Sequence, residues 1–252
     1  MSSILIANCP EAELPYISEG DSEMEILDGV PIEFDRDALL DKLHIDKEGK
    51  NAEDIQDLIE AVAPAMKPKA IYEVSYIHYK NYDTVDIGGV IFVSRVLRVN
   101  LDKVQRVFPY IATCGRELDE IAIPSDDLLR RFWLDSIKEM VLDAMRKYLT
   151  NHLKERYALG ELSRMSPGSG SQDLWPIEQQ RQLFSIFGNV EDLIGVTLTD
   201  SFLMIPLKSV SGIYFPTEIR FESCQLCPRK VCPGRRAPYD KNLLESYYKE
   251  RG

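Results

Sequence analysis

The spacing of apolar and polar positions divides the chain into helical and strand-like segments. Residues 125–159 contain the longest periodic segment, in which apolar side chains from Leu129 to Leu149 recur at intervals of three and four and so form the stripe of an amphipathic helix. Gly160 is expected to end this helix, because glycine readily takes the left-handed conformation that closes many helices. Two shorter helices are predicted earlier in the chain, at 34–43 and 51–66.

Most of the remaining apolar segments have the patterns of β-strands. Residues 70–87 mix β-branched and aromatic side chains, and a second strand-like run follows the Gly88–Gly89 turn. The compact apolar run at 104–115 predicts a buried strand, reached through a short helix that Ser94 caps. Alternating apolar positions over 194–215 predict the closing strands.

The segment 164–214 combines three patterns within about fifty residues. RMSPGSGS is a turn, WPIEQQRQLFSIFG predicts a helix with Pro176 at its first position, and alternating apolar positions follow. This combination is more typical of a built ligand cleft than of generic core.

Changes in composition predict three parts. Residues 1–70 are acidic and form a lobe of helices and loops that Pro64 and Pro68 close, and residues 71–216 hold the main domain. Residues 217–252 are rich in Cys, Pro and Arg and show no core periodicity. We interpret this last part as an appended tail.

Composition and charge narrow the class of protein. The 252 residues are 44% hydrophobic and 28% charged, which is ordinary for a soluble globular protein. The net charge of -11 argues against binding to nucleic acid or to an anionic membrane surface. The sequence contains neither a secretion signal nor 18 consecutive apolar residues, and its five cysteines suit a reducing compartment. We therefore expect a cytoplasmic protein.

The order and wording of 164–214 resemble the activation domain of cobalamin-dependent methionine synthase, and the likeness extends roughly from Tyr72 to Tyr214. Members of this family bind S-adenosylmethionine and remethylate a corrinoid that has been oxidised out of its cycle. The resemblance implies an α+β fold with a curved, mainly antiparallel sheet and packed helices. The cobalamin is expected to belong to a partner, because the chain has no DxHxxG-type cobalt-ligating motif.

The resemblance also implies a ligand site at the Ser-Pro-Gly turn. Arg164 is expected to hold the carboxylate of S-adenosylmethionine through two charge-assisted hydrogen bonds. The backbone at Ser166 and Gly168 can approach the ligand closely, since glycine has no Cβ. Ser169 stands where the family usually has a tyrosine, and this departure removes a stacking or hydroxyl contact.

Two further residues enter the site through the resemblance. Tyr214 is expected to cover the adenine or ribose, and Asp143 in the long helix is expected to face the amine and the sulfonium. Taken alone, Tyr214 would be a core residue, Asp143 a solvated helix residue and Arg164 a surface ion-pair partner.

Three cysteines in the tail form a candidate metal site. Cys224, Cys227 and Cys232 bring three thiols within nine residues, and Cys9 or Cys114 could supply a fourth ligand. An iron-sulfur cluster, zinc and free redox-active thiols are the alternatives. The reduction of cobalt(II) to cobalt(I) favours iron, because zinc has no redox chemistry. The basic RKVCPGRR segment could instead dock an acidic, low-potential electron donor.

The leading hypothesis is a stand-alone reactivation protein. It would bind S-adenosylmethionine and present the methyl group to cobalt(I) of a partner corrinoid protein or of a methionine synthase core. No side chain is assigned a catalytic role, because catalysis here would consist of positioning, and whether the protein is itself an enzyme stays open. The alternative is a non-catalytic scaffold or an iron-sulfur electron-transfer adaptor for a corrinoid methyltransferase system.

Overall fold

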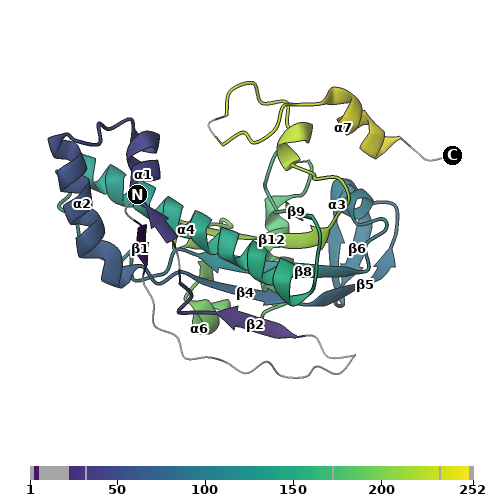
Figure 1. The fold of residues 1–252 in the computed structure, drawn as a ribbon. Helices are drawn as coiled ribbons and strands as arrows, with labels where there is room; N and C mark the ends of the chain where they lie inside the picture. Colours follow the sequence, from purple (N-terminus) through teal and green to yellow (C-terminus); the bar gives the residue numbers. More distant parts are fainter. Residues whose placement is uncertain (1–2, 6–22, 32, 172, 233, 250–252) are drawn as a thin grey trace.

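The structure is a computed structural model that describes residues 3–5, 23–31, 33–171, 173–232 and 234–249 (Figure 1). The strands are β1 (Ser3–Leu5), β2 (Met24–Leu27), β3 (Glu33–Asp35), β4 (Lys69–Glu73), β5 (Ser75–Lys80), β6 (Thr84–Ile87), β7 (Val90–Val93), β8 (Arg106–Thr113), β9 (Leu162–Met165), β10 (Thr197–Leu198), β11 (Met204–Ile205) and β12 (Ser209–Pro216). The helices are α1 (Arg36–Leu43), α2 (Lys50–Val62), α3 (Arg95–Asn100), α4 (Leu128–Arg156), α5 (Gln180–Ser185), α6 (Val190–Ile194) and α7 (Lys241–Tyr248), with 3-10 turns η1 (Ala63–Ala65), η2 (Ile177–Gln179) and η3 (Ser223–Leu226).

Strand β8 is the centre of the main sheet. Its neighbours are β4 and β5 on one side and β12 on the other, and β12 in turn pairs with β9. All these pairings are antiparallel. Seven of the eight residues of β8 are buried, because helices cover both faces of the sheet at this point. The buried strand expected in the apolar run at 104–115 is thus confirmed.

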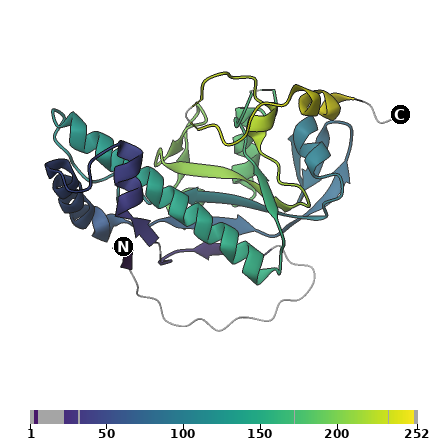
Figure 2. The same ribbon diagram turned by 45° about the horizontal axis from the view of Figure 1, so that its top comes forward.

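The two faces of the sheet carry separate cores. Helix α4 crosses one face diagonally, with α1 and α2 beside its first half (Figures 1 and 2). The opposite face packs against α3, α5, Trp175 and the C-terminal residues Phe221 and Leu226, and a further cluster around α6 covers Ile71 and Ile111. Strand β12 serves both cores, because Val210 and Tyr214 face α4 whereas Ile213 and Phe215 face the other way.

The long helix follows its predicted stripe except at its start. Leu129 and Phe132 are 51% and 58% exposed, although their spacing placed them on the buried face. Trp133 and Leu134, which follow Phe132, are buried, so only one side of the start of α4 is left uncovered. Phe132 lies at a pocket that the preceding loop forms with the start of this helix.

The helix also ends earlier than Gly160. Its last residue is Arg156, and Ala158 takes the left-handed conformation with φ of 50°. The amide of Leu159 then donates to the carbonyl of Lys154 at 2.9 Å, which closes the end in the Schellman pattern. The prediction that Gly160 provides the stop is wrong, because the hydrogen bonding of the final turn places the left-handed residue two positions earlier.

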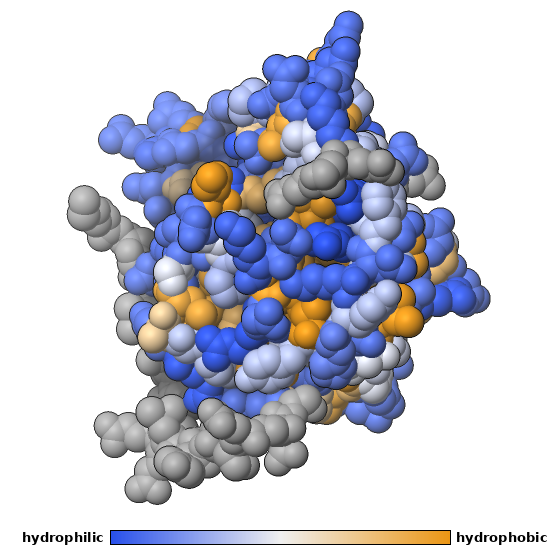
Figure 3. All heavy atoms as spheres, turned by 90° about the vertical axis from the view of Figure 1, so that its right-hand side faces the viewer, coloured by the Kyte–Doolittle hydropathy of each residue, from blue (hydrophilic) through white to orange (hydrophobic). Residues whose placement is uncertain are grey.

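The C-terminal segment contributes to the core. Phe221, Leu226 and Tyr247 are buried in the same cluster as Trp175, although no periodicity marked them as core residues. Residues 217–249 thus pack on the main sheet where they are described, and the three-part division of the chain stays a prediction. On the side of α7 and β5–β7, Figure 3 shows apolar side chains among polar ones, and Ile91 of β7 is 60% exposed. Among the described residues, no helix has both the length and the apolar character needed to cross a bilayer.

Candidate functional site

The Ser-Pro-Gly segment forms a tight turn directly after β9. The amide of Ser169 donates to the carbonyl of Ser166 at 3.1 Å, and Gly168 has φ of 74°. Proline followed by a residue with positive φ is the signature of a type II turn. The amide of Gly168 also donates to the carbonyl of Trp175 at 2.8 Å, which ties the turn to the segment before α5. The predicted turn is confirmed.

Arg164 projects from β9 beside β12. It lies opposite Tyr214 in the strand register, and the Tyr214 hydroxyl group favours the charged form of its guanidinium group. Burial disfavours its charge, but the neighbouring Tyr110, Tyr214 and Glu222 outweigh this effect and raise the pKa of Arg164. The residue therefore remains a cation although it is largely enclosed.

Tyr214 is a support for Arg164 in this structure. Only 2% of the residue is exposed, and its ring centroid lies 4.4 Å from that of Tyr110. Its hydroxyl oxygen lies 3.1 Å from Oγ1 of Thr150 on α4. A ring enclosed in this way offers no face to a ligand, so its effect on a ligand would pass through its hydroxyl group and through Arg164.

Tyr110 of β8 is a buried polar residue that sequence reasoning missed. Its hydroxyl group is buried, and although Ser166 lies beside it, no described residue forms a hydrogen bond of normal geometry with it. Burial is the main cause that raises the pKa of Tyr110, and the electrostatic effect of Tyr214 adds to it, so the hydroxyl group stays protonated. Tyr110 stands inside an apolar run, so the sequence pattern marks it as an ordinary core residue. Its pairing opposite Gly212 in the strand register shows that it belongs to the site.

Gly212 explains how these groups come together. A Cβ at this position would lie 2.4 Å from the carbonyl oxygen of Met165 and 2.6 Å from Oγ of Ser166. Such distances are too short for any side chain, so glycine permits β9 and the following turn to lie close to β12. The close approach brings Ser166 to the side of Tyr110.

Asp143 lies on α4 at the solvent side of this cluster. Its carboxylate is 53% exposed and pairs with Arg146 at 3.0 Å, one helical turn further on. Arg146 is the second residue that sequence reasoning missed, although its spacing from Asp143 is a signal for an ion pair. The Nε atom of Arg146 is buried without a hydrogen-bond partner among the described residues.

The predicted site residues thus form two neighbouring groups. The structure brings Arg164, Ser166 and Tyr214 together around Tyr110, and the turn at Gly168 and Ser169 follows directly. We call Arg164, Tyr110, Tyr214, Arg146 and Ser166 the arginine–tyrosine cluster. Asp143 adjoins it only through Arg146.

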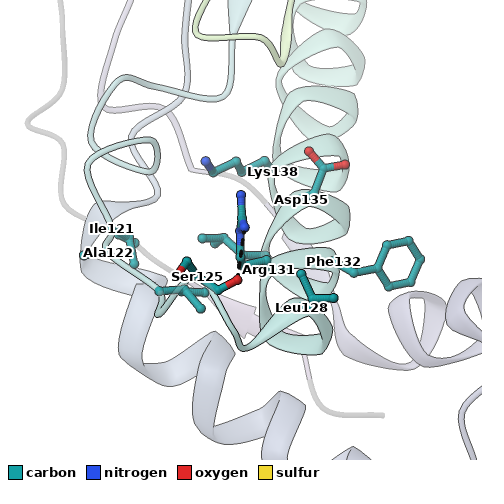
Figure 4. A pocket seen from close by; sticks show the side chains of 10 residues that line it. Ile121, Ala122, Ser125, Leu128, Arg131, Phe132, Asp135 and Lys138 are labelled. Carbon is teal, nitrogen blue, oxygen red and sulfur yellow. Dashed lines mark hydrogen bonds between the residues drawn. The ribbon is translucent and has the colours of Figure 1, made fainter.

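A separate pocket of about 730 Å³ lies at the start of α4, between the helix and the preceding loop (Figure 4). Its lining includes Ile121, Ser125, Arg131 and Lys138. Arg131 points into it. The lining includes none of the residues that the sequence predicts to bind the ligand.

Comparison with known families shows which proteins the chain resembles in this region. The family described as the activation domain of vitamin B12 dependent methionine synthase matches residues 148–221, which include Arg164, the turn and Tyr214. The chain resembles this activation domain. A crystal structure of the MetH reactivation domain bound to AdoHcy is similar with a TM-score of 0.52 at 14% identity, over 80% of this chain and 81% of that chain. At such identity the match establishes the fold alone, and it confirms the curved antiparallel sheet with packed helices. No curated protein matches the sequence.

The activation-domain match ends at Phe221, directly before the segment that contains Cys224, Cys227 and Cys232, which we call the cysteine segment. The amide of Phe221 donates to Oγ of Ser163 at 2.8 Å, and a Cβ at Gly170 would lie 3.3 Å from the carbonyl oxygen of Ser223. The start of this segment therefore lies directly against the Ser-Pro-Gly turn. No pattern in the sequence predicts this proximity.

The backbone carbonyls of the three tail cysteines all accept hydrogen bonds from Arg235, that of Cys232 from its amide at 3.1 Å. The guanidinium group of Arg235 donates to the carbonyls of Cys224 and Cys227 at 3.2 and 3.3 Å. Within the described ranges, no group of three or more His, Cys, Asp or Glu side chains is arranged to hold a metal ion. Burial raises the pKa of Cys114 to about 12, and Cys9 lies outside the described residues. An iron-sulfur or zinc site at Cys224, Cys227 and Cys232 stays a prediction.

Proposed function

We propose that the protein binds S-adenosylmethionine beside the Ser-Pro-Gly turn and presents its methyl group to the reduced cobalt of a corrinoid carried by a partner protein. The partner would be a corrinoid-binding protein or a methionine synthase core. The observation that carries this proposal is the match of residues 148–221 to the activation domain, because this segment contains the turn and three residues of the arginine–tyrosine cluster, Arg164, Ser166 and Tyr214.

The chemistry of the cluster fits such a ligand. Arg164 is a largely enclosed cation, and the acidic residue that acts on it, Glu222, is already bound by Arg220 at 3.0 Å and by Arg236 at 2.8 Å. The buried hydroxyl group of Tyr110 also lacks a hydrogen-bond partner of normal geometry in the part of the chain that the structure describes. A carboxylate accepts hydrogen bonds at both oxygens and would satisfy groups of this kind.

In this proposal the chain acts by holding and orienting the ligand. Arg164 would fix the carboxylate, and the exposed turn at Gly168 would leave room for the adenosyl part beside the backbone. The partner's corrinoid, when bound, supplies the nucleophile that accepts the methyl group. Fixing the methyl sulfonium in line with that nucleophile replaces a bimolecular encounter by a unimolecular step, and no side chain needs to transfer a proton.

The test is a calorimetric titration of the anaerobically purified protein with S-adenosylmethionine. Wild-type protein is expected to show saturable binding, and Arg164→Ala should lose about 1.5–3 kcal/mol of binding free energy, or roughly ten- to 150-fold in Kd. The matched control is Arg130→Ala, which removes an exposed arginine of α4 far along the helix from the cluster. An absence of binding to wild-type protein at millimolar ligand would contradict the proposal and would favour a scaffold that does not bind the ligand.

An iron-sulfur electron-transfer role is the second candidate, and the position of the cysteine segment against the turn favours it. An iron-sulfur cluster held by Cys224, Cys227 and Cys232 would lie next to the site where cobalt must be reduced. Iron and acid-labile sulfide should then be present after anaerobic purification and should disappear in Cys224→Ser. Protein without iron and sulfide in both forms would exclude this role.

A further inference from the structure

The arginine–tyrosine cluster contains more positive charge and more unused hydrogen-bonding capacity than Arg164 alone supplies. Two buried polar atoms of the cluster, the Tyr110 hydroxyl oxygen and Arg146 Nε, have no hydrogen-bond partner of normal geometry among the described residues. Native proteins satisfy almost all such atoms, so two of them in one place point to a group that the folded chain itself does not provide.

The two arginines act on the same tyrosine. Burial raises the pKa of Tyr110, whereas the charges of Arg164 and Arg146 both act to lower it, so both arginines lie within electrostatic range of its hydroxyl group. The position of Arg146 is fixed by α4, whose Thr150 contacts Tyr214 one turn later. The cluster is therefore built from four elements, α4, β8, β9 and β12.

The acidic groups nearby do not balance this charge. Asp143 is more than half exposed and binds Arg146 from the solvent side, and Glu222 is held by two other arginines. The interior of the cluster therefore contains two guanidinium groups and a phenol, all of which can donate hydrogen bonds. A small planar anion is the chemical group that matches these donors.

We propose that Arg146 and Tyr110 form, with Arg164, a two-arginine clamp that makes a free carboxylate obligatory in the ligand. The inference rests on the proposed function and deepens it. The clamp also orients the ligand, because two cations repel a sulfonium at close range. The carboxylate must then lie inside the cluster and the methyl sulfonium toward the exposed turn at Gly168, where a partner can reach it.

The test compares ligands with and without the carboxylate. S-adenosylmethionine and S-adenosylhomocysteine carry it, whereas 5′-methylthioadenosine has the same adenosyl thioether without the amino acid group. Arg146→Gln and Tyr110→Phe should each weaken the first two ligands at least about fivefold and leave methylthioadenosine unchanged. Lys147→Gln removes a neighbouring, exposed charge of α4 and should change none of the three affinities.

Tyr110→Phe offers a second readout that a purely structural residue would not give. Removing an unsatisfied buried hydroxyl group should raise the melting temperature of the ligand-free protein by about 2–4 °C while it weakens binding. A residue that only supports the fold would instead lower both. Equal losses for all three ligands, or unchanged binding of S-adenosylmethionine in both variants, would overturn the clamp.

The outcomes separate the two proposals. If wild-type protein binds S-adenosylmethionine but the variants bind it equally well, the clamp fails and the proposed function stands. If wild-type protein does not bind S-adenosylmethionine, the proposed function fails, and L-methionine then serves as the carboxylate probe in the same titration. Binding of L-methionine that Arg146→Gln abolishes would retain the clamp, and no such binding would overturn it.

Discussion

Gly212→Ala tests whether the close approach of β9 and β12 builds the site. An added Cβ would meet the carbonyl oxygen of Met165 at 2.4 Å, whereas ordinary contacts begin at 3.4 Å, so β9 would need to retreat by about 1 Å. The obstructing atom belongs to the backbone, so no side-chain rotation can relieve the clash. Overpacking of this kind costs about 1–3 kcal/mol of unfolding free energy.

The matched control is Gly160→Ala. A Cβ at Gly160 meets nothing within 4 Å, and its φ lies outside the left-handed region. Both substitutions reduce the conformational entropy of the unfolded chain by a similar amount, worth about 0.4–1 kcal/mol, so the difference between the two variants isolates the clash.

Urea denaturation of the three proteins measures these free energies, and calorimetry measures S-adenosylmethionine binding to the same samples. Gly212→Ala should unfold at lower urea and should also bind weakly, because β9 carries Arg164 and leads into the turn. Gly160→Ala should match or slightly exceed wild-type stability. Wild-type stability in Gly212→Ala, or an equal loss in the control, would show that the close approach of β9 and β12 does not require glycine at this position.

Three further predictions concern other parts of the molecule. Burial acts to raise the pKa of Glu25, but hydrogen bonds led by that from His152 outweigh it and hold the pKa below its usual value. The stability that Glu25 contributes should therefore be present above pH 4.5 and be lost as the pH drops through the lowered folded-state pKa. Urea midpoints should fall less with decreasing pH in Glu25→Gln than in wild-type protein, although some fall remains because Glu222, whose pKa is lowered despite its burial, still titrates. Leu226→Ala should cost about 2–5 kcal/mol in denaturation experiments because the residue is fully buried, whereas Val231→Ala, at an 85% exposed position, should cost almost nothing. Cys114 should resist iodoacetamide until the protein unfolds, because its buried thiol has a pKa raised to about 12, and mass spectrometry of native protein should detect no label there.

Local patterns were sufficient to predict most of the elements of the fold. The apolar stripe located α4, the capping serine Ser94 located the start of α3, and its hydroxyl group accepts from the amide of Leu97 at 3.0 Å as expected. The Ser-Pro-Gly turn was equally predictable, because its conformation depends on residues 166–169 alone. Such features are local, so the residues that determine them are adjacent in the sequence.

The composition of the site depends on contacts between distant segments. Tyr110 lies in an apolar run and is brought to Arg164 only by the pairing of β8, β12 and β9. The alternating pattern alone indicated that Tyr214 is a core residue, and the structure buries it under α4, whereas its expected contact with a ligand came from the family resemblance and stays a prediction. Leu226 is a core residue because the surface that covers it comes from elsewhere in the chain.

The weak pairing of Asp143 with Arg146 connects the structure to the role that the sequence implied for Asp143. An exposed ion pair one turn apart on a helix contributes about 0.5 kcal/mol or less, whereas a hydrogen bond from a charged donor to an enclosed carboxylate contributes about 1.5–3 kcal/mol. Arg146 would therefore exchange Asp143 for the ligand's carboxylate at little cost. The exchange would release the Asp143 carboxylate, and a free carboxylate at the solvent side of the clamp lies where a ligand's amine or sulfonium would need a counter-charge. Under this reasoning Asp143→Asn should weaken binding of S-adenosylmethionine, which carries both cationic groups, more than binding of S-adenosylhomocysteine, which lacks the sulfonium.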